Sequence, residues 1–380
     1  MNYREKNISA LANYFASGCK NEQLLGLELE HFVVDKQTRH SLHYENGVEL
    51  ILNRLQPLYG APILSQGHII GINGKDAAIT LEPAAQLEIS IKPLQNIAEI
   101  SQIYDDFISL LTPILDDMGC ELVYAGYHPK SKVDELPLIP KIRYKHMDAH
   151  FKTTGTRGKN MMKGSAATQV SIDYYSEADF SKKYRVATVL SPLLAFITDN
   201  TDVFEGQPFN KKMVRTYIWN DVDPARSMIA RGALDSNFGF YEYGAYVYDT
   251  PPIFLPTGVG DDVVYTGSKS NAELFADRLM TTEDIEHVIS MVFPDVRLKK
   301  CIEIRMADSM PMGCVLDYLA LLQRIFYDES NLDTIYQETL RVGNCEVVAA
   351  KDELMEKGTD AVVYGRSAGE WIAKMKAINL

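Results

Sequence analysis

Hydrophobic residues recur along this chain with two different periods. A spacing of three and four positions, typical of helices with one buried face, is found in residues 8–15, 47–58 and 96–118. Gly119 follows the last of these segments, in the position where a glycine commonly ends a helix. Ser176 and Thr281, each followed three residues later by an aspartate, predict the starts of two further helices, the first covering 180–203.

Other segments alternate apolar and polar residues or are rich in β-branched and aromatic side chains, which is typical of strands. They predict six strands, at residues 24–34, 78–91, 121–126, 166–175, 245–248 and 298–306. No internal repeat, low-complexity tract or linker divides the chain. We therefore predict a single domain over residues 1–380, of class α+β with a mainly antiparallel sheet, in which residues 328–380 form a helical C-terminal part.

The first predicted strand places two carboxylates on one face. Because side chains alternate along a strand, Leu25, Leu27 and Leu29 share one face. Glu28 and Glu30 share the opposite face. For this strand alone the simplest interpretation is a surface in contact with water, since carboxylates are mostly exposed.

The same arrangement recurs in three other predicted strands. It places acceptor side chains on one face at Glu82, Gln86 and Glu88, at Gln169, and at Glu303 beside Arg305. Carboxylates that converge repel one another and are costly to keep ionised unless a cation neutralises them. Mg²⁺ prefers hard oxygen ligands and usually shares them with substrate phosphates, whereas zinc would need closely spaced His or Cys. The strands therefore predict a magnesium-nucleotide site, although neither G-x-x-x-x-G-K-[ST] nor G-x-G-x-x-G occurs.

Composition and net charge limit the classes of ligand that the chain is expected to bind. With 38 Lys and Arg against 51 Asp and Glu, the net charge of -13 works against binding nucleic acid or an anionic membrane, and favours small-molecule ligands. The five cysteines are widely separated and form no zinc or redox motif, as is typical of a reducing compartment. No long apolar run or signal-peptide core is present, so we expect no membrane span and a cytoplasmic location.

Short motifs follow one another in order from about Gly26 to Asp308. They are Gly26–Phe32 (family pattern G-T-E-x-E-K-F), Thr80–Ser90 (S-L-E-P-G-G-Q-F-E-L-S), Pro140–Met147 (P-K-x-R-Y-x-x-M), Gly155–Met162 (G-T-x-G-x-D-M-M), Gln169-Val170 (T-V-Q-V-N), Met213–Asp223 (M-R-S-x-I-W-x-D-x-D), and Phe293–Lys300 with Glu303–Asp308 (F-P-x-V-R-L-K, E-x-R-x-A-D). Together they resemble the plant-type glutamate-cysteine ligases, a family similar to glutamine synthetase in its curved antiparallel sheet. The resemblance implies a glutamine synthetase-like half barrel backed by helices, and it does not extend beyond about Tyr327.

The resemblance also implies a reaction and a set of site residues. The metal ligands would be Glu28, Glu30, Glu82, Glu88, Gln169 and Glu303. Arg305 would contact the ATP phosphate and act in catalysis with Glu303. The substrate-binding residues would be Arg215, Trp219 and Gln86. The cofactor would be Mg²⁺ or Mn²⁺, with ATP as co-substrate, and a monomer or homodimer would join L-glutamate to L-cysteine through a γ-glutamyl phosphate.

Some residues depart from the family pattern. Two family glycines are replaced by Ala84 and Ala85, so we expect the backbone there either to avoid positive φ or to approach its neighbours less closely. Leu27 replaces a threonine, and the paired cysteines that act as redox switches in plant members are not evident. Three alternatives stay open at this point: a γ-glutamyl ligase with another amine acceptor, a guanidino-type phosphotransferase that uses Mg-ATP, and a nucleotide-binding protein without activity.

Overall fold

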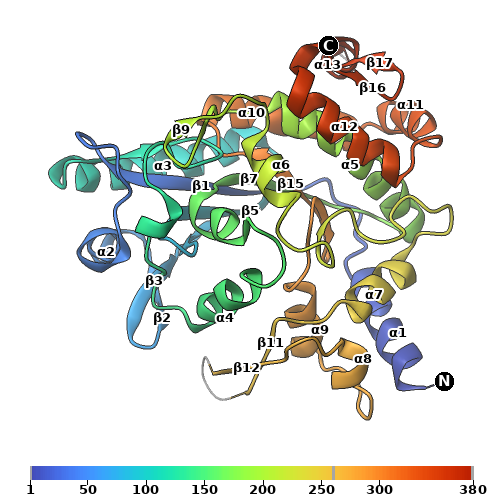
Figure 1. Cartoon of the computed structure of the whole chain (residues 1–380), viewed down its shortest axis with the longest axis horizontal. Helices are drawn as coiled ribbons and strands as arrows, with labels where there is room; N and C mark the ends of the chain where they lie inside the picture. Colours follow the sequence, from blue (N-terminus) through green and yellow to red (C-terminus); the bar gives the residue numbers. More distant parts are fainter. Residues whose placement is uncertain (1, 259–261, 378–380) are drawn as a thin grey trace.

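A mainly antiparallel sheet organises the chain in the computed structural model, which describes residues 2–258 and 262–377 (Figure 1). Within these residues nine strands form the main sheet, in the order β14-β15-β7-β1-β5-β4-β3-β2, with β6 paired to the far end of β1. Its strands are β1 (Leu25–Asp35), β2 (Ala61–Ser65), β3 (His68–Asn73), β4 (Ala77–Leu81), β5 (Leu87–Leu94), β6 (Cys120–Val123), β7 (Ala167–Ile172), β14 (Val296–Leu298) and β15 (Ile302–Asp308). Every pair among them is antiparallel, and the sheet is not closed into a barrel.

Short strand pairs lie outside the main sheet. They are β8 (Val203–Phe204) with β9 (Gln207–Pro208), β10 (Ser227–Met228) with β13 (Phe293–Pro294), β11 (Phe254–Pro256) with β12 (Val263–Tyr265), and β16 (Val362–Val363) with β17 (Arg366–Ser367). The pair β10–β13 is parallel and leads directly into β14. It therefore ties the long connection after α6 to the edge of the main sheet.

The helices are distributed over both sides of the sheet. They are α1 (Tyr3–Ala16), α2 (Glu49–Tyr59), α3 (Ile97–Asp117), α4 (Ile142–Phe151), α5 (Glu177–Ile197), α6 (Val214–Trp219), α7 (Phe240–Asp249), α8 (Asn271–Leu274), α9 (Thr282–Ile289), α10 (Met312–Tyr327), α11 (Glu329–Thr339), α12 (Asn344–Lys357) and α13 (Ala368–Ala377). The helices α3, α5 and α10 contact the main sheet, while α11, α12 and α13 pack on α5. The C-terminal helices are thus part of the same packed body (Figure 1).

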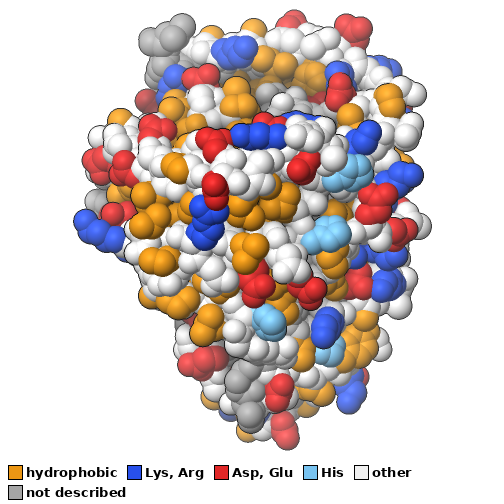
Figure 2. Space-filling model, turned by 90° about the vertical axis from the view of Figure 1, so that its left-hand side faces the viewer, with side chains coloured by type: hydrophobic (Ala, Val, Ile, Leu, Met, Phe, Trp, Pro, Cys, Tyr) orange, Lys and Arg blue, Asp and Glu red, His pale blue; other side chains and the backbone are white. Residues whose placement is uncertain are grey.

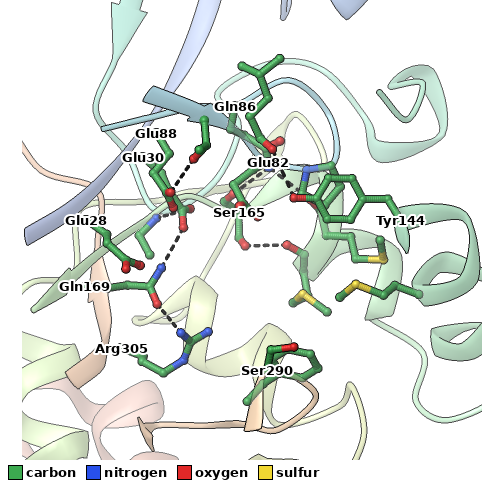
Figure 3. Close-up of a pocket in the computed structure, with 18 of the residues that line it drawn as sticks. Glu28, Glu30, Glu82, Gln86, Glu88, Tyr144, Ser165, Gln169, Ser290 and Arg305 are labelled. Carbon is green, nitrogen blue, oxygen red and sulfur yellow. Dashed lines mark hydrogen bonds between the residues drawn. The ribbon is translucent and has the colours of Figure 1, made fainter. Parts of the chain in front are cut away.

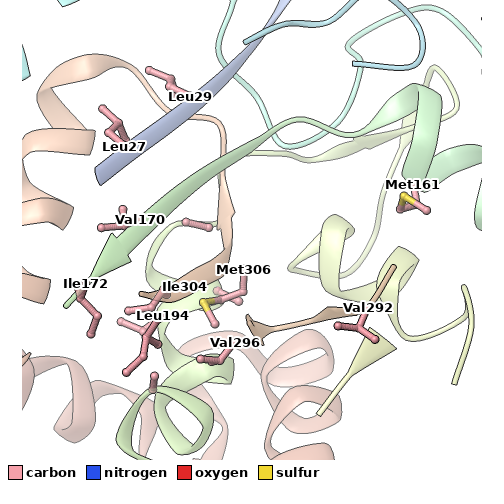
Figure 4. Close-up of a cluster of buried hydrophobic side chains, with 14 of the residues drawn as sticks. Leu27, Leu29, Met161, Val170, Ile172, Leu194, Val292, Val296, Ile304 and Met306 are labelled. Atoms are coloured by element: carbon pink, nitrogen blue, oxygen red, sulfur yellow. The ribbon is translucent and has the colours of Figure 1, made fainter. Parts of the chain in front are cut away.

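The apolar face of the sheet is the core. Leu27 and Leu29 of β1, Val170 of β7 and Ile304 of β15 are all buried, and Leu194 of α5 belongs to the same cluster (Figure 4). Each fully buried side chain of this size contributes about 1.5–3 kcal/mol. Because the register pins these residues to the core, the alternate residues of the same strands are held on the other face.

Most of the predicted elements are confirmed within a few residues. The predicted helices correspond to α1, α2, α3 and α5, and the strands at 24–34, 121–126 and 166–175 correspond to β1, β6 and β7. The predicted end of the helix over 180–203 is wrong, because α5 ends at Ile197 and Val203 lies in β8. Gly119 has a positive φ of 68° after α3, as expected of a helix-ending glycine. Thr281 and Asp284 form a complete capping box before α9. The mixed α+β class with a mainly antiparallel sheet is therefore confirmed.

Two of the predicted strands are wrong in length because each is a hairpin. Residues 78–91 divide into β4 and β5, which pair with Thr80 opposite Glu88. Residues 298–306 contain a reversal between β14 and β15, which pair with Val296 opposite Ile304. Both segments keep alternating across the turn, so periodicity alone could not locate the reversal.

The strand predicted at residues 245–248 is also wrong, because this segment belongs to α7. Tyr243, Tyr246, Val247 and Tyr248 are all buried, and α7 packs against α1. Aromatic and β-branched residues favour strands only weakly, and tertiary packing of a largely buried helix overrides that preference.

The turn between β4 and β5 carries a residue in the left-handed region. Ala85 has a φ of 67°, so the alternative in which the alanines avoid positive φ is wrong. The Ala85 amide donates to the Glu82 carbonyl, and the Glu82 amide donates to the Gln86 carbonyl, each at 2.9 Å. These hydrogen bonds hold the turn closed against a conformational cost of about 1–2 kcal/mol for a residue with a Cβ.

The surface carries charges of both signs. On the face shown in Figure 2, Lys and Arg side chains are interspersed with Asp and Glu, and no basic patch gathers there. Among the residues that the structure describes, no helix is both long and apolar enough to cross a bilayer.

The left-handed alanine gives a stability prediction. Ala84→Gly and Ala85→Gly both remove a buried methyl and loosen the unfolded chain, but only Ala85 has a positive φ. We therefore expect Ala85→Gly to be the more stable variant by about 1–2 kcal/mol in urea unfolding. Equal free energies of unfolding for the two variants would contradict the strained turn.

Candidate active site

Strand register brings the predicted carboxylates onto one wall. Glu28 of β1 lies opposite Gln169 of β7, and Glu30 lies opposite Glu88 of β5. Directly opposed residues of antiparallel strands project to the same face. Figure 3 shows Glu28, Glu30, Glu88 and Gln169 grouped on one side of the cavity.

The cavity in front of this wall has a volume of about 330 Å³ and is lined by side chains of both charges. The acidic ones are Glu28, Glu30, Glu82 and Glu88, with Glu82 supplied by the turn after β4. The basic side chains that line the same cavity are Lys141 and Arg143 of the α4 segment, Arg215 of α6, and Arg297 and Arg305 of the β14–β15 hairpin. A ligand that combines bound cations with a polyanion would match this division of charge.

The four carboxylates of the wall are difficult to ionise together. Burial, and then the charges of Glu303 and Glu88, raises the pKa of Glu28 to about 7. Burial followed by Glu82 and Glu88 raises the pKa of Glu30 well above its usual range. The pKa values of Glu82 and Glu88 are also raised, chiefly by burial. Nearby cations therefore do not offset the burial and mutual repulsion of these four carboxylates.

Hydrogen bonds orient part of the wall. The Glu30 carboxylate accepts from the Ala167 amide at 2.8 Å and from Gln169 Nε2 at 3.1 Å. Gln169 Oε1 accepts in turn from Arg305 Nη1, so this glutamine bridges the acidic wall and the arginine (Figure 3). Glu88 Oε1 accepts from the hydroxyl groups of Thr80 and Ser90, at 2.7 and 3.1 Å.

Glu303 differs from the other carboxylates because the protein neutralises it. It is fully buried, and its oxygens accept from Arg297 Nε at 2.7 Å, Lys299 Nζ at 2.6 Å and Arg305 Nη1 at 2.8 Å. Burial alone would raise its pKa, but the three cations hold the pKa well below its usual range. Glu303 therefore anchors basic residues, and its role as a metal ligand stays a prediction.

Arg305 lies on an irregularity in β15. The register with β7 shifts between Ile304 and Ala307, which leaves Arg305 and Met306 outside the regular pairing. Arg215 Nη1 donates to the carbonyls of Met306 and Ala307 at 2.9 and 2.8 Å, and Nη2 donates to that of Arg305 at 3.4 Å. Arg215 thus stabilises the bulge that presents Arg305 to the cavity.

The three residues predicted to bind substrate all line the cavity, but their polar atoms differ in how far they are already hydrogen-bonded to the protein. Arg215 is 5% exposed, and its Nε is buried without a hydrogen-bond partner. Gln86 uses its whole amide on the protein, since it donates to the Met162 and Ser165 carbonyls and accepts from the Ala84 amide. Trp219 lines the cavity from the end of α6. Their substrate-binding roles stay predictions.

The sequence interpretation missed four basic residues of the site. Arg297 and Lys299 hold Glu303, Lys141 lines the cavity, and Arg143 lines it with its Nε buried and without a hydrogen-bond partner. All four lie in quoted motifs, Pro140–Met147 and Phe293–Lys300. A search of those motifs for cations to balance the carboxylates could have found them.

A family model described as Glutamate-cysteine ligase family 2 (GCS2) matches residues 24–373. The chain belongs to this family. The match includes most of the C-terminal helices, where the sequence motifs alone gave no resemblance. The chloroplastic glutamate-cysteine ligases of Nicotiana tabacum and Arabidopsis thaliana are 29% and 28% identical to it, over 338 and 339 residues. Each alignment covers 87% of this chain and 64% of the relative, so the chain spans slightly less than two thirds of their length.

A solved structure shares the fold of this family member. It is the glutamate-cysteine ligase of Francisella tularensis in complex with AMP, with a TM-score of 0.53 and 11% sequence identity. The match covers 95% of this chain and 78% of that chain. At this identity the likeness concerns the fold alone.

Substitution of an uncompensated carboxylate, Glu28, and of a compensated one, Glu303, should change stability in opposite directions. At pH 8, without metal or nucleotide, Glu28→Gln should raise the free energy of unfolding by about 1–3 kcal/mol, because it removes a charge that the folded wall disfavours. Glu303→Gln should lower it by about 3–5 kcal/mol, because buried Arg297 and the partly buried Lys299 and Arg305 lose their counter-ion. Urea unfolding in a chelator measures both. A Glu303→Gln protein as stable as the wild type would contradict the anchoring role.

Proposed function

We propose that this chain joins the γ-carboxylate of L-glutamate to the amine of L-cysteine, with conversion of ATP to ADP and phosphate, as a first step toward glutathione-type thiols. The observation that carries the proposal is the cavity that four glutamates line together with a set of arginines. Membership of the glutamate-cysteine ligase family supports it, as do the names of the plant relatives. The AMP in the Francisella structure supports adenine-nucleotide use.

The proposed reaction has two steps. The γ-carboxylate of glutamate attacks the γ-phosphorus of ATP, ADP leaves, and a γ-glutamyl phosphate forms. The cysteine amine then attacks the acyl carbon, loses a proton, and phosphate leaves as the amide forms. Phosphoryl transfer depends chiefly on positioning and charge neutralisation. Arg305 would contact the transferred phosphoryl group, and Arg215 or Arg143 would hold a substrate carboxylate.

The donor set of the wall fits Mg²⁺ or Mn²⁺. Glu28, Glu30, Glu82, Glu88 and Gln169 offer hard oxygen ligands, and a cation would offset the burial and mutual repulsion that raise the pKa values of the four glutamates. In residues 2–258 and 262–377, no group of three or more His, Cys, Asp or Glu side chains is placed to hold a metal ion. Glu30 and Glu88 would therefore have to turn from their present donors. When bound, the ion would neutralise triphosphate charge.

Other features belong to the same proposal. The chain would form a single catalytic domain, and its open antiparallel sheet would be a glutamine synthetase-like half barrel. A cytoplasmic location and a monomeric or homodimeric state stay predictions, and the plant relatives are chloroplastic by name. Family membership favours a ligase over a guanidino-type phosphotransferase or an inactive binding protein.

The ligase activity can be tested directly. Purified protein given ATP, Mg²⁺, glutamate and cysteine should release ADP and form γ-glutamylcysteine, identified by mass spectrometry. Parallel reactions with other amino-acid acceptors serve as controls. A faster reaction with another acceptor would replace cysteine in the proposal, and no ADP release with any acceptor would refute a ligase.

The phosphate contact predicts a large effect of one arginine. Arg305→Ala should reduce kcat on the order of 10³-fold or more, the scale on which other phosphoryl-transfer enzymes depend on such an arginine. Arg366→Ala is the matched control, because Arg366 is exposed and paired with Glu338 near the C-terminal helices. Circular dichroism would check that both variants fold. An Arg305→Ala enzyme with a wild-type kcat would remove this residue from the reaction.

A further inference from the structure

A buried lysine of the C-terminal helices is paired with an aspartate in the segment between β13 and β14. Lys351 of α12 is 3% exposed, and its Nζ lies 2.5 Å from Asp295 Oδ2. Ser191 of α5 donates a second, longer hydrogen bond of 3.3 Å to the same oxygen. A lysine is almost never fully buried unless it is paired, so this ion pair links α12 to the segment between β13 and β14.

Asp295 connects that ion pair to both site arginines. Its carbonyl accepts from the Arg305 amide at 3.0 Å, at the start of the bulge. With Arg215, Arg305 and Trp219 it also lines a second cavity of about 20 Å³, room for roughly one water molecule, which shares these three residues with the main one. Its negative charge is among those that act on the Arg215 guanidinium.

The same helix also supports the segment that carries Arg215. The Met355 carbonyl of α12 accepts from the Lys212 amide at 3.0 Å, directly before α6. The residue that follows, Met213, begins α6 from the left-handed region with a φ of 60°. Helix α12 therefore contacts both backbone segments that position the arginines.

We propose that Lys351 is a positioning residue for the active site: by neutralising Asp295, it keeps Arg215 and Arg305 available to substrate. Without the lysine, the Asp295 carboxylate, whose side chain is 12% exposed, would lose its ion-pair partner. It would then attract Arg215 and Arg305, which line the same small cavity, away from the substrate, because a largely buried charge that loses its partner seeks another. The inference rests on the proposed function for what the arginines bind, and it assigns a role to the C-terminal helices.

The main test compares Lys351→Met with a matched buried pair. Lys183 and Asp179 of α5 lie 3.0 Å apart with side chains 4% and 2% exposed, and neither lines the cavity. Both Lys351→Met and Lys183→Met should lower the Tm. Only Lys351→Met should raise the KM for ATP or glutamate, with a loss of kcat/KM on the order of 10²-fold, as expected for misplaced binding groups. It should also weaken MgATP binding measured by calorimetry.

A double variant keeps the proposal falsifiable. Lys351→Met with Asp295→Asn removes both charges, so it should regain stability and most of the lost kcat/KM and MgATP affinity. A folded Lys351→Met protein with wild-type KM, kcat and MgATP affinity would overturn the positioning role. A double variant as impaired as the single one would also overturn it, because the effect would then not pass through the Asp295 charge.

The two proposals fail in different ways. A wild type that binds MgATP but forms no γ-glutamyl product refutes the proposed function, while the calorimetric comparison still decides the role of Lys351. A wild type that binds no MgATP refutes both.

Discussion

Charge compensation on a buried sheet face is the constraint on which the rest of the structure depends. Ions removed from water cost several kcal/mol each unless they are paired. Glu303 is compensated within the protein by Arg297, Lys299 and Arg305. The carboxylates of Glu28, Glu30, Glu82 and Glu88 are not compensated to the same degree, and their pKa values are raised. The folded protein therefore keeps an acidic wall. In the proposed function, a bound cation would neutralise these carboxylates and would itself bind an anionic ligand.

The bulge in β15 then determines where the guanidinium groups of Arg305 and Arg215 lie. The bulge in β15 turns Arg305 toward Gln169 and the cavity, and the carbonyls it exposes are bound by Arg215. An arginine that caps three carbonyls is less free than one that awaits a ligand, but its rigidity also positions the groups around it. Helix α12 supports the same region through Lys351 and Met355, so residues late in the chain reach a site formed by the sheet.

Periodicity identified the type of most elements but not every chain reversal. In residues 78–91 and 298–306, alternation continues across a hairpin, and the turn is visible only through cross-strand hydrogen bonds. The left-handed Ala85 was unexpected because the closure of that turn overrides the preference of alanine. Residues 245–248 have strand composition, yet packing of α7 against α1 makes them helical. Local preference is too small to decide such cases against burial.

The sequence by itself determined that Glu28, Glu30 and Glu88 lie on the face of their strands opposite the apolar residues. It also determined that ordered motifs resemble one ligase family. The face on which a side chain lies is a local property, since side chains alternate along any strand. Only the tertiary structure decided that Glu303 is paired with three cations, that Gln86 is occupied by backbone groups, and that Lys351 is paired with Asp295. Those facts depend on which distant segments meet, and contacts between segments far apart in the chain leave no periodic trace in it.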